Sequence, residues 1–327
     1  MTSMQPFPAN RSLWVRCRHH CQDYPPGTTH MTRIAIDGGQ SALRLRVLPS
    51  RRTGNGPGYT HGPDAVSNLL EAIRAAASEA ELTGPVDVVA LGLTGYPQAH
   101  GAAERFAADV GEVLNADEVR LTQDMVTAHA GALPDGYGVV VAAGTGLVCL
   151  AVDRDGTWRK LDGHGYLFGD AGSAFAIGRA GLVAVQRARD GRGPVTKLAD
   201  TALDPVALYR SSTLVDDVAR FAPEVLRCAA EGDPVALDLL VHAAGDIAET
   251  IGAAVAQLAG EGPVPVACVG GLFDGAGEQL LTPVREALPS RAKLTPAAGN
   301  SLDGAERLAS GPPGTYADLI VTHHRQR

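Results

Sequence analysis

The chain lacks any apolar run long enough for a typical membrane-spanning helix. Such a helix needs roughly 18 or more consecutive apolar residues, and no run in the 327 residues approaches that length. Basic residues are also few, since 28 Lys and Arg stand against 36 Asp and Glu, for a net charge of -8. This balance lacks the basic footprint of a nucleic-acid-binding protein. We therefore expect a cytoplasmic protein with neither a membrane nor a nucleic acid as partner.

Cysteine is scarce, and its pattern excludes a disulfide framework. The cysteines are odd in number and scattered (Cys17, Cys21, Cys149, Cys228 and Cys268). Cys17-Arg-His-His-Cys21 carries metal-ligating side chains, but no second ligand pair stands at zinc-finger spacing.

Two nucleotide-binding signatures are missing as well, because the chain has neither a Walker A motif nor a strict G-x-G-x-x-G.

Residues 1–30 have no periodicity and lack the apolar core of a secretory signal. We interpret Met31 as the natural start of the protein, or residues 1–30 as a disordered leader. The folded chain is then expected to form one domain over 31–137 and a second over 138–312. Its last helix is expected to pack back on the first domain, and residues 313–327 are expected to form a loose tail.

What the chain does have is two glycine turns, each between two apolar strands. The first is Asp37-Gly38-Gly39-Gln40-Ser41, and the second is Gly144-Thr145-Gly146. Glycine has no Cβ, so such a turn can direct several backbone N–H groups at one anion. Two turns of this kind predict two halves of the chain that meet on one polyphosphate.

Strand-like and helix-like segments alternate along the chain, which predicts an α/β fold. A hairpin, a helix, a strand, a helix, a strand and a helix occur in order, and the same layout begins again near residue 139, with extra helices inserted. The expected strands are 34–37, 43–48, 86–93, 119–121 and 264–269, and the expected helices begin near 63, 102, 123, 172, 233, 278 and 302. The halves share layout more than sequence, so the repeat is weak.

Two aspartates follow strands in the first half. Asp37 can hold a Mg²⁺-bound water, although an ordinary Asp-Gly hairpin turn explains it equally well. Asp124 can act as a general base, although a carboxylate at a helix N-terminus is also common.

Two glycine-rich segments lie in the second half. Residues 163–173 end in Gly-Asp-Ala-Gly-Ser before a helix, so Asp170 either orients a polyol or caps the loop. Gly270-Gly271 follows a buried strand and lets a purine lie on the backbone, or is a plain strand-to-helix turn.

The order of these segments resembles the sugar kinase/heat-shock ATPase/actin superfamily. Within it, residues 33–310 are similar to the N-acetylglucosamine kinase and BadF/BadG/BcrA/BcrD ATPase family. The most specific segment is 163–173, which is similar to the family's Gly-Trp-Gly…Gly-Asp-Glu-Gly-Ser signature. The closing segment 302–309 is similar to the family's final Gly-Ala helix.

The resemblance implies two ribonuclease-H-like domains that flank a nucleotide site, with a helical insertion in the second. It implies Asp124 as the catalytic base, and Asp37 as a Mg²⁺ contact through water. The implied ATP contacts are Asp37, Gly38, Gly39, Gln40, Gly144, Thr145, Gly146, Gly270 and Gly271. The implied sugar contacts are Thr94, Gly95, Asn55, His164 and Asp170.

Three residues depart from the family pattern. Gln40 stands where a glycine is usual, His164 replaces a tryptophan, and Ala171 replaces a glutamate. The resemblance still implies an enzyme that uses ATP and Mg²⁺ to phosphorylate an amino sugar, with N-acetylglucosamine as the first candidate. A homodimer is one alternative for its oligomeric state. Two other functions stay open: an ATPase that activates a dehydratase, which needs clustered cysteines, and a sugar sensor with weakened catalysis.

Overall fold

The computed structural model describes residues 31–325 apart from 41, 61, 98, 99 and 202. Residues 31–327 form one compact unit. The expectations for residues 1–30, including the Cys17–Cys21 cluster, lie outside the described residues.

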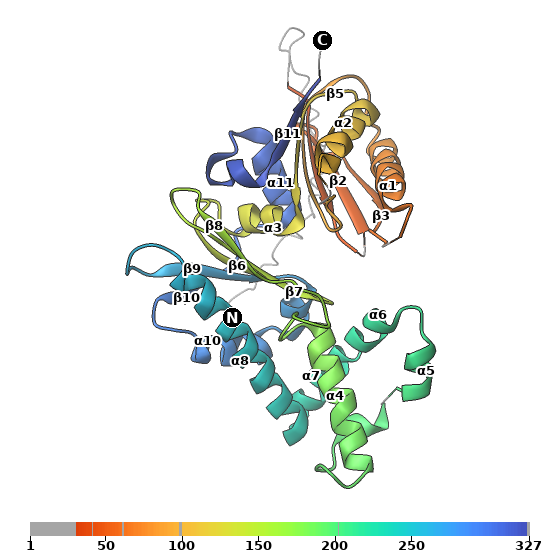
Figure 1. The fold of residues 1–327 in the computed structure, drawn as a ribbon, viewed down its shortest axis with the longest axis vertical. Helices are drawn as coiled ribbons and strands as arrows, with labels where there is room; N and C mark the ends of the chain where they lie inside the picture. Colours follow the sequence, from red (N-terminus) through yellow and green to blue (C-terminus); the bar gives the residue numbers. More distant parts are fainter. Residues whose placement is uncertain (1–30, 41, 61, 98–99, 202, 326–327) are drawn as a thin grey trace, which may run out of the picture. The chain divides into compact units, whose positions relative to one another are not determined.

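The first half of this unit is a six-stranded sheet in the order β11-β5-β4-β1-β2-β3 (Figure 1). β1 pairs in parallel with β4, and β4 with β5, while the other neighbours are antiparallel. The strands are β1 (Arg33–Gly38), β2 (Ala42–Leu48), β3 (Thr53–Pro57), β4 (Val86–Leu93), β5 (Ala116–Gln123) and β11 (Val321–His324).

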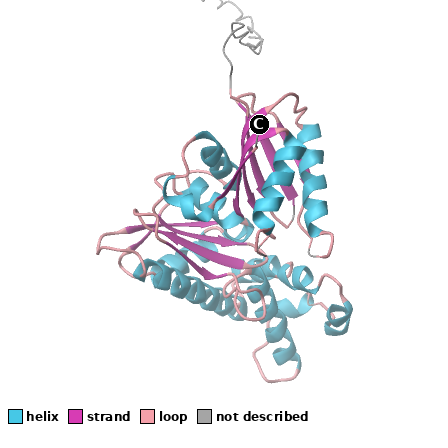
Figure 2. Ribbon diagram, turned by 45° about the horizontal axis from the view of Figure 1, so that its top comes forward, coloured by secondary structure: helices cyan, strands magenta, loops and turns pink. Residues whose placement is uncertain are grey.

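Helices cover both faces of this sheet (Figure 2), and successive side chains of β1 point alternately to these two faces. Ile34 and Ile36 point to the face covered by α1 (Ala65–Glu79) and α2 (Ala102–Leu114). Ala35 points to the other face, where it packs against α11 (Ser301–Ser310). α3 (Asp124–Ala132) lies beside α11, and its Met125 and Val126 pack both with Ala90 of the first sheet and with Leu150 of the second.

The second sheet has the order β10-β9-β6-β7-β8. β6 (Gly138–Ala143) and β7 (Leu147–Val152) form a hairpin that continues into β8 (Trp158–Asp162). β9 (Val264–Val269) adds in parallel to β6, and β10 (Ala292–Leu294) to β9. The opening hairpin and its parallel neighbour repeat the arrangement of β1, β2 and β4.

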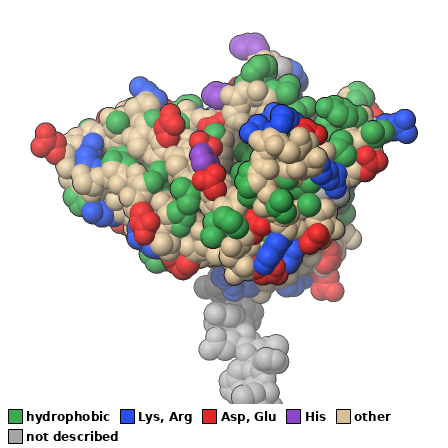
Figure 3. Space-filling model, turned by 90° about the horizontal axis from the view of Figure 1, so that it is seen from below, with side chains coloured by type: hydrophobic (Ala, Val, Ile, Leu, Met, Phe, Trp, Pro, Cys, Tyr) green, Lys and Arg blue, Asp and Glu red, His purple; other side chains and the backbone are tan. Residues whose placement is uncertain are grey.

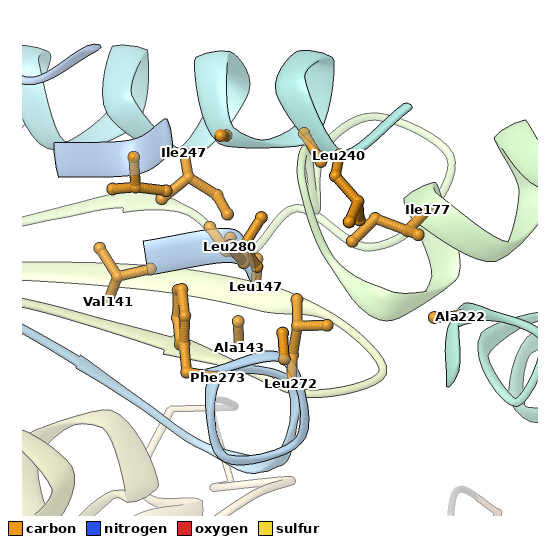
Figure 4. Close-up of a cluster of buried hydrophobic side chains, with 14 of the residues drawn as sticks. Val141, Ala143, Leu147, Ile177, Ala222, Leu240, Ile247, Leu272, Phe273 and Leu280 are labelled. Atoms are coloured by element: carbon orange, nitrogen blue, oxygen red, sulfur yellow. The ribbon is translucent and has the colours of Figure 1, made fainter. Parts of the chain in front are cut away.

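One face of the second sheet is covered by helices. α8 (Pro234–Ala256) and α9 (Gly271–Ala276) pack against its strands. The other helices of this half pack on these two and on one another: α4 (Ala174–Arg189), α5 (Pro205–Arg210), α6 (Leu214–Ala219), α7 (Ala222–Ala230) and α10 (Glu278–Ala287). In the core, Ile247 of α8 and Leu280 of α10 lie near the strand side chains of Val141 and Leu147 (Figure 4). The predicted α/β class with two actin-like halves and an inserted set of helices is confirmed.

α8 is long and apolar enough to cross a membrane by length and composition, which the sequence reading did not anticipate. In the structure, Leu240, Ile247 and Ile251 of this helix are buried in the core of the second half. Leu237 and Val241 of the same helix are exposed.

The expectation of a loose tail is also wrong. Residues 314–319 form a 3₁₀ helix, and β11 pairs antiparallel with β5 at the edge of the first sheet. The short polar strand Val-Thr-His-His has little hydrophobic signal, and its place comes from the unpaired edge of β5. β3 was not among the expected strands, and its Gly54 and Gly56 let α1 approach the backbone closely.

Candidate functional site

The first glycine turn closes between β1 and β2. Asp37 is the penultimate residue of β1 and is buried, whereas Gln40 at the tip of the turn is exposed. The Gly39 N–H donates to the carbonyl of Ala42 at 3.0 Å, which closes the turn. The turn therefore leaves Gln40 exposed, three residues after the buried Asp37.

Arg44 is the partner of that carboxylate, and the sequence reading did not find it. Asp37 and Arg44 stand opposite each other in the β1–β2 hairpin, and Arg44 Nη2 lies 2.5 Å from Asp37 Oδ2. Burial raises the pKa of Asp37, Arg44 lowers it, and the nearby Asp124 raises it. The alternation Leu43-Arg44-Leu45-Arg46 was the available signal, because it aims both arginines away from the apolar face.

Asp124 and Thr94 meet at the ends of two parallel strands. Asp124 follows β5 as the first residue of α3, and Thr94 follows β4. The Thr94 hydroxyl donates to Asp124 Oδ2, and the Met125 N–H donates to Asp124 Oδ1 at 2.8 Å. The Thr94 N–H donates to the carbonyl of Gly38 at 2.7 Å, which ties Asp124 to the first glycine turn.

Close backbone packing holds the helix that carries Asp124. A Cβ on Gly92 would lie 2.2 Å from the Thr127 hydroxyl, and one on Gly304 would lie 1.8 Å from the Thr127 carbonyl oxygen. These two glycines therefore let β4 and α11 press against α3 from two sides. Gly95, one of the expected sugar contacts, has a φ of +73° and packs against the ring of Tyr59.

The second glycine turn is bonded to the start of α4. The N–H groups of Ala174 and Phe175 donate to the carbonyls of Gly144 and Thr145 at 3.0 and 3.1 Å. A Cβ on Gly144 would meet no atom within 4 Å, so its surface is open to a ligand.

Asp170 supports this turn from behind. Its Oδ1 accepts the Leu147 N–H at 3.2 Å, and its Oδ2 would lie 2.8 Å from a Cβ on Gly146. Burial raises the pKa of the Asp170 carboxyl. Asp170 thus has a partner at the end of the second glycine turn, although the resemblance assigned it to the sugar.

Asp162 shapes the loop that contains Asp170, and the sequence reading did not find it either. Its two carboxylate oxygens accept the N–H groups of Asp170 and Ala171 at 2.7 and 3.1 Å. Asp162 and Asp170 both have φ in the left-handed region, at 55° and 58°. His164, another expected sugar contact, is exposed in this loop.

Gly270 fits tightly beside the second turn. Its φ is +102°, and a Cβ there would lie 2.5 Å from the carbonyl oxygen of Ala143. β9 can therefore end against β6 only with glycine at this position. The next residue, Gly271, begins α9.

A cavity of about 860 Å³ brings several of the expected ATP contacts together. Gln40 comes from the first turn, Gly144 and Thr145 from the second, and Gly271 from the start of α9. Residues of α6 and α7, including Asp216, Arg220 and Arg227, complete the wall. No short sequence pattern marks those helices as part of a nucleotide pocket.

Asn55 has a different environment from the other expected sugar contacts. It lies on β3 at the sheet edge, where its side-chain amide donates to Glu79 of α1 at 3.2 Å. Its backbone N–H donates to the same carboxylate at 2.8 Å. The structure thus gives Asn55 a partner on α1 and no contact with Thr94 or Asp124.

The described cysteines do not form a cluster. Cys149 and Cys268 stand opposite the same residue, Val141, on the two strands that flank β6. Burial raises the pKa of both thiols, that of Cys268 to about 12. Within residues 31–325, no group of three His, Cys, Asp or Glu side chains is placed to hold a metal ion.

The repeated sheets, the two glycine turns and the shared cavity define an actin-like ATPase of the sugar kinase class. The model of the BadF/BadG/BcrA/BcrD ATPase family matches residues 30–302. The chain belongs to this family and is an enzyme that uses ATP.

Similar proteins have sugar kinase names. The glucosamine kinase GspK of Vibrio cholerae is 26% identical over 231 residues, which are 65% of this chain and 77% of that protein. The N-acetyl-D-glucosamine kinase of Dictyostelium discoideum is 29% identical over 154 residues, so the match spans about half of its length (48%). A solved structure described as an N-acetylglucosamine kinase from Chromobacterium violaceum has a TM-score of 0.67 and 26% identity, over 85% of this chain and 98% of that one.

Proposed function

We propose that the protein transfers the γ-phosphoryl group of ATP to a hydroxyl of an amino sugar, with N-acetylglucosamine as the first candidate and the cytoplasm as its location. The observation that carries this proposal is the contact of Thr94 with both Asp124 and the Gly38 turn. This contact supports a carboxylate base beside a phosphate-binding turn. Phosphoryl transfer requires mainly such positioning, together with neutralisation of charge.

Asp124 is the general base of this proposal. Both of its oxygens accept a hydrogen bond, from the Thr94 hydroxyl and from the Met125 N–H. These two donors orient the carboxylate and leave further lone pairs for the proton of an attacking hydroxyl. Thr94 and Gly95 are the proposed sugar contacts beside it, while His164 and Asn55 are weaker candidates on their observed environments.

The phosphates are proposed to lie between the two glycine turns. Gly38, Gly39 and Gln40 would contact them from one side, and Gly144, Thr145 and Gly146 from the other. Gly270 and Gly271 would lie against the adenosine. The cavity that contains Gln40, Gly144, Thr145 and Gly271 supports this arrangement.

Mg²⁺ is proposed to bind through water at Asp37. Arg44 bonds only Oδ2 of this carboxylate, and no described residue donates a hydrogen bond to Oδ1. A free carboxylate oxygen near a phosphate turn is the chemistry that Mg²⁺ requires. The ion would neutralise charge on the transferred group, and Asp37 would orient one of its water ligands.

The names of similar proteins guide the choice of substrate. They are kinases of glucosamine, of N-acetylglucosamine, and of N-acetylmuramic acid together with N-acetylglucosamine. All of these sugars carry nitrogen at one ring position.

A coupled ADP-release assay tests the proposal with glucose, glucosamine, N-acetylglucosamine, N-acetylmannosamine and N-acetylmuramic acid. We expect ADP release that depends on one or two of the amino sugars and exceeds the rate with glucose. ADP release that is the same with and without every sugar would contradict the proposal.

A further inference from the structure

A second cavity, of about 830 Å³, lies among the helices of the second half. Its walls come from the loop around Tyr166, from α4, and from the segments around α5 and α6. Leu182, Leu208, Leu214 and Val218 make most of the interior apolar. Exposed Leu167 and Tyr209 stand at its edge, with 69% and 88% of their surfaces accessible.

The cavity is separate from the nucleotide cavity. Leu214 and Val218 of α6 line it, whereas Asp216 and Ala219 of the same helix line the cavity of about 860 Å³ proposed for the nucleotide. Alternate faces of α6 therefore form a common wall between two different spaces.

The charged residues of this second cavity are all basic. Arg179, Arg187 and Arg192 line it, and no Asp or Glu does so among the described residues, although the whole chain is acidic. Arg187 donates to the carbonyl of Arg192 at 3.0 Å, and Arg192 pairs with Asp190. Arg179 is exposed to solvent at this cavity and has no hydrogen bond or ion pair with any described residue.

A buried hydrogen-bond donor lies on α4, two helical turns after Arg179. The side-chain Nε2 of Gln186 is buried and has no hydrogen-bond partner among the described residues. It also lines the cavity. A buried amide without a partner costs stability unless a ligand or water satisfies it. The cavity thus combines apolar walls, an unpaired guanidinium and an unsatisfied donor.

We propose that this cavity binds a small organic acid, with its apolar body among the leucines and its acidic group on Arg179 and Gln186. Arg179 supplies donors in a fork that matches carboxylate, sulfonate or phosphate oxygens. Figure 3 shows the molecule from below, where green hydrophobic, blue basic and red acidic side chains are interspersed. The proposal does not depend on which sugar the enzyme phosphorylates.

The test uses the full chain and 8-anilinonaphthalene-1-sulfonate, a fluorescent probe with an apolar body and one anionic group. We expect saturable binding of one probe per chain that saturating ADP does not displace. Arg179→Gln should weaken binding by about tenfold, because a charge-assisted hydrogen bond is lost. Arg189→Gln is the matched control, since Arg189 lies on α4 but does not line the cavity.

Two further measurements keep the result specific. The uncharged N-phenyl-1-naphthylamine should bind wild type and Arg179→Gln equally, and Ala176→Trp should fill the cavity and reduce binding of both probes. Displacement by ADP, or equal effects of Arg179→Gln and Arg189→Gln, would overturn the proposal. Probe binding that appears only on dilution to monomers would assign this surface to a second copy of the chain and would also overturn it.

Discussion

Thr94 donates a hydrogen bond from its hydroxyl to Oδ2 of Asp124, and its own N–H bonds the carbonyl of Gly38 at 2.7 Å. The three residues belong to three adjoining strand ends, because β1, β4 and β5 are parallel neighbours. One threonine therefore links the proposed base to the first glycine turn.

Replacement of Thr94 by valine removes this link while it keeps the shape of the side chain. We expect Thr94→Val to lower kcat by about tenfold, because the Asp124 carboxylate loses an orienting donor worth about 1–2 kcal/mol. The KM for ATP should change little. Thr94→Ser is the control that keeps the hydroxyl, and steady-state kinetics on the preferred sugar give both values. An unchanged kcat in Thr94→Val would show that the link does not matter.

The contact between α3 and α11 requires glycine at position 304. A Cβ there would lie 1.8 Å from the Thr127 carbonyl oxygen, so Gly304→Ala must push the two helices apart. We expect the free energy of unfolding to fall by about 1–3 kcal/mol or more, with a loss of activity through displaced Asp124. Gly245→Ala on α8 is the control, because a Cβ there meets no atom within 4 Å and should raise stability by about 0.5–1 kcal/mol. Similar melting temperatures for the two variants would contradict this account of the packing.

Gly270 gives a test of the proposed adenosine site. Gly270→Ala places a Cβ 2.5 Å from the carbonyl oxygen of Ala143, at a φ of +102°. We expect ADP to bind about tenfold more weakly by calorimetry, because the end of β9 must move away from the second turn. Gly260→Ala has a comparable positive φ of +75° but no neighbour within 4 Å, so it controls for backbone strain alone. Equal ADP affinity in both variants would argue against the assignment.

The burial of His129 is expected to make the stability of the fold depend on pH. His129 is buried, its Nε2 donates to the Gly138 carbonyl at 3.1 Å, and its Nδ1 accepts from the Tyr316 hydroxyl at 2.8 Å. Burial lowers the pKa of His129 to about 4, from an ordinary value of 6.5. Because the folded pKa is depressed, the stability from this group is present above pH 6.5 and is lost as the pH falls towards 4.

The expected loss is about 3 kcal/mol between pH 7 and pH 4. Urea unfolding across this range measures it in wild type and in His129→Gln, which keeps a donor but does not titrate. The variant should be less stable at pH 7 and should lose less stability on acidification. The same pH slope in both proteins would show that His129 does not contribute.

Much of the fold could be predicted from the sequence because its apolar patterns are strong and local. The continuous apolar runs at 86–93 and 264–269 are strands with those bounds, and the amphipathic segment 102–114 is a helix with those bounds. β3 and β11 could not be predicted in this way. Both are short strands with little apolar pattern: β3 extends the neighbouring β2, and β11 adds to the edge of β5, which is far away in the sequence.

The candidate site was predicted less completely, because several of its contacts depend on how segments pack together. Glycine turns and strand-end aspartates are local features, so Asp37, Gly144 and Asp124 could be recognised. Arg44 and Asp162 act through partners across a hairpin or a loop, and only the structure displays those contacts. The wall that α6 and α7 give to the proposed nucleotide cavity depends on how an inserted segment packs, which no local pattern encodes.

The most direct test of the account is the activity of Asp124→Asn in the ADP-release assay with the preferred amino sugar. Asparagine keeps the size of the side chain and an oxygen acceptor but cannot take a proton at neutral pH. We predict that kcat falls by about 10²–10⁴-fold, that ADP affinity stays within twofold, and that Asp109→Asn on the exposed face of α2 behaves as wild type. Turnover of Asp124→Asn close to that of wild type would contradict the proposed role of Asp124 and the mechanism built on it.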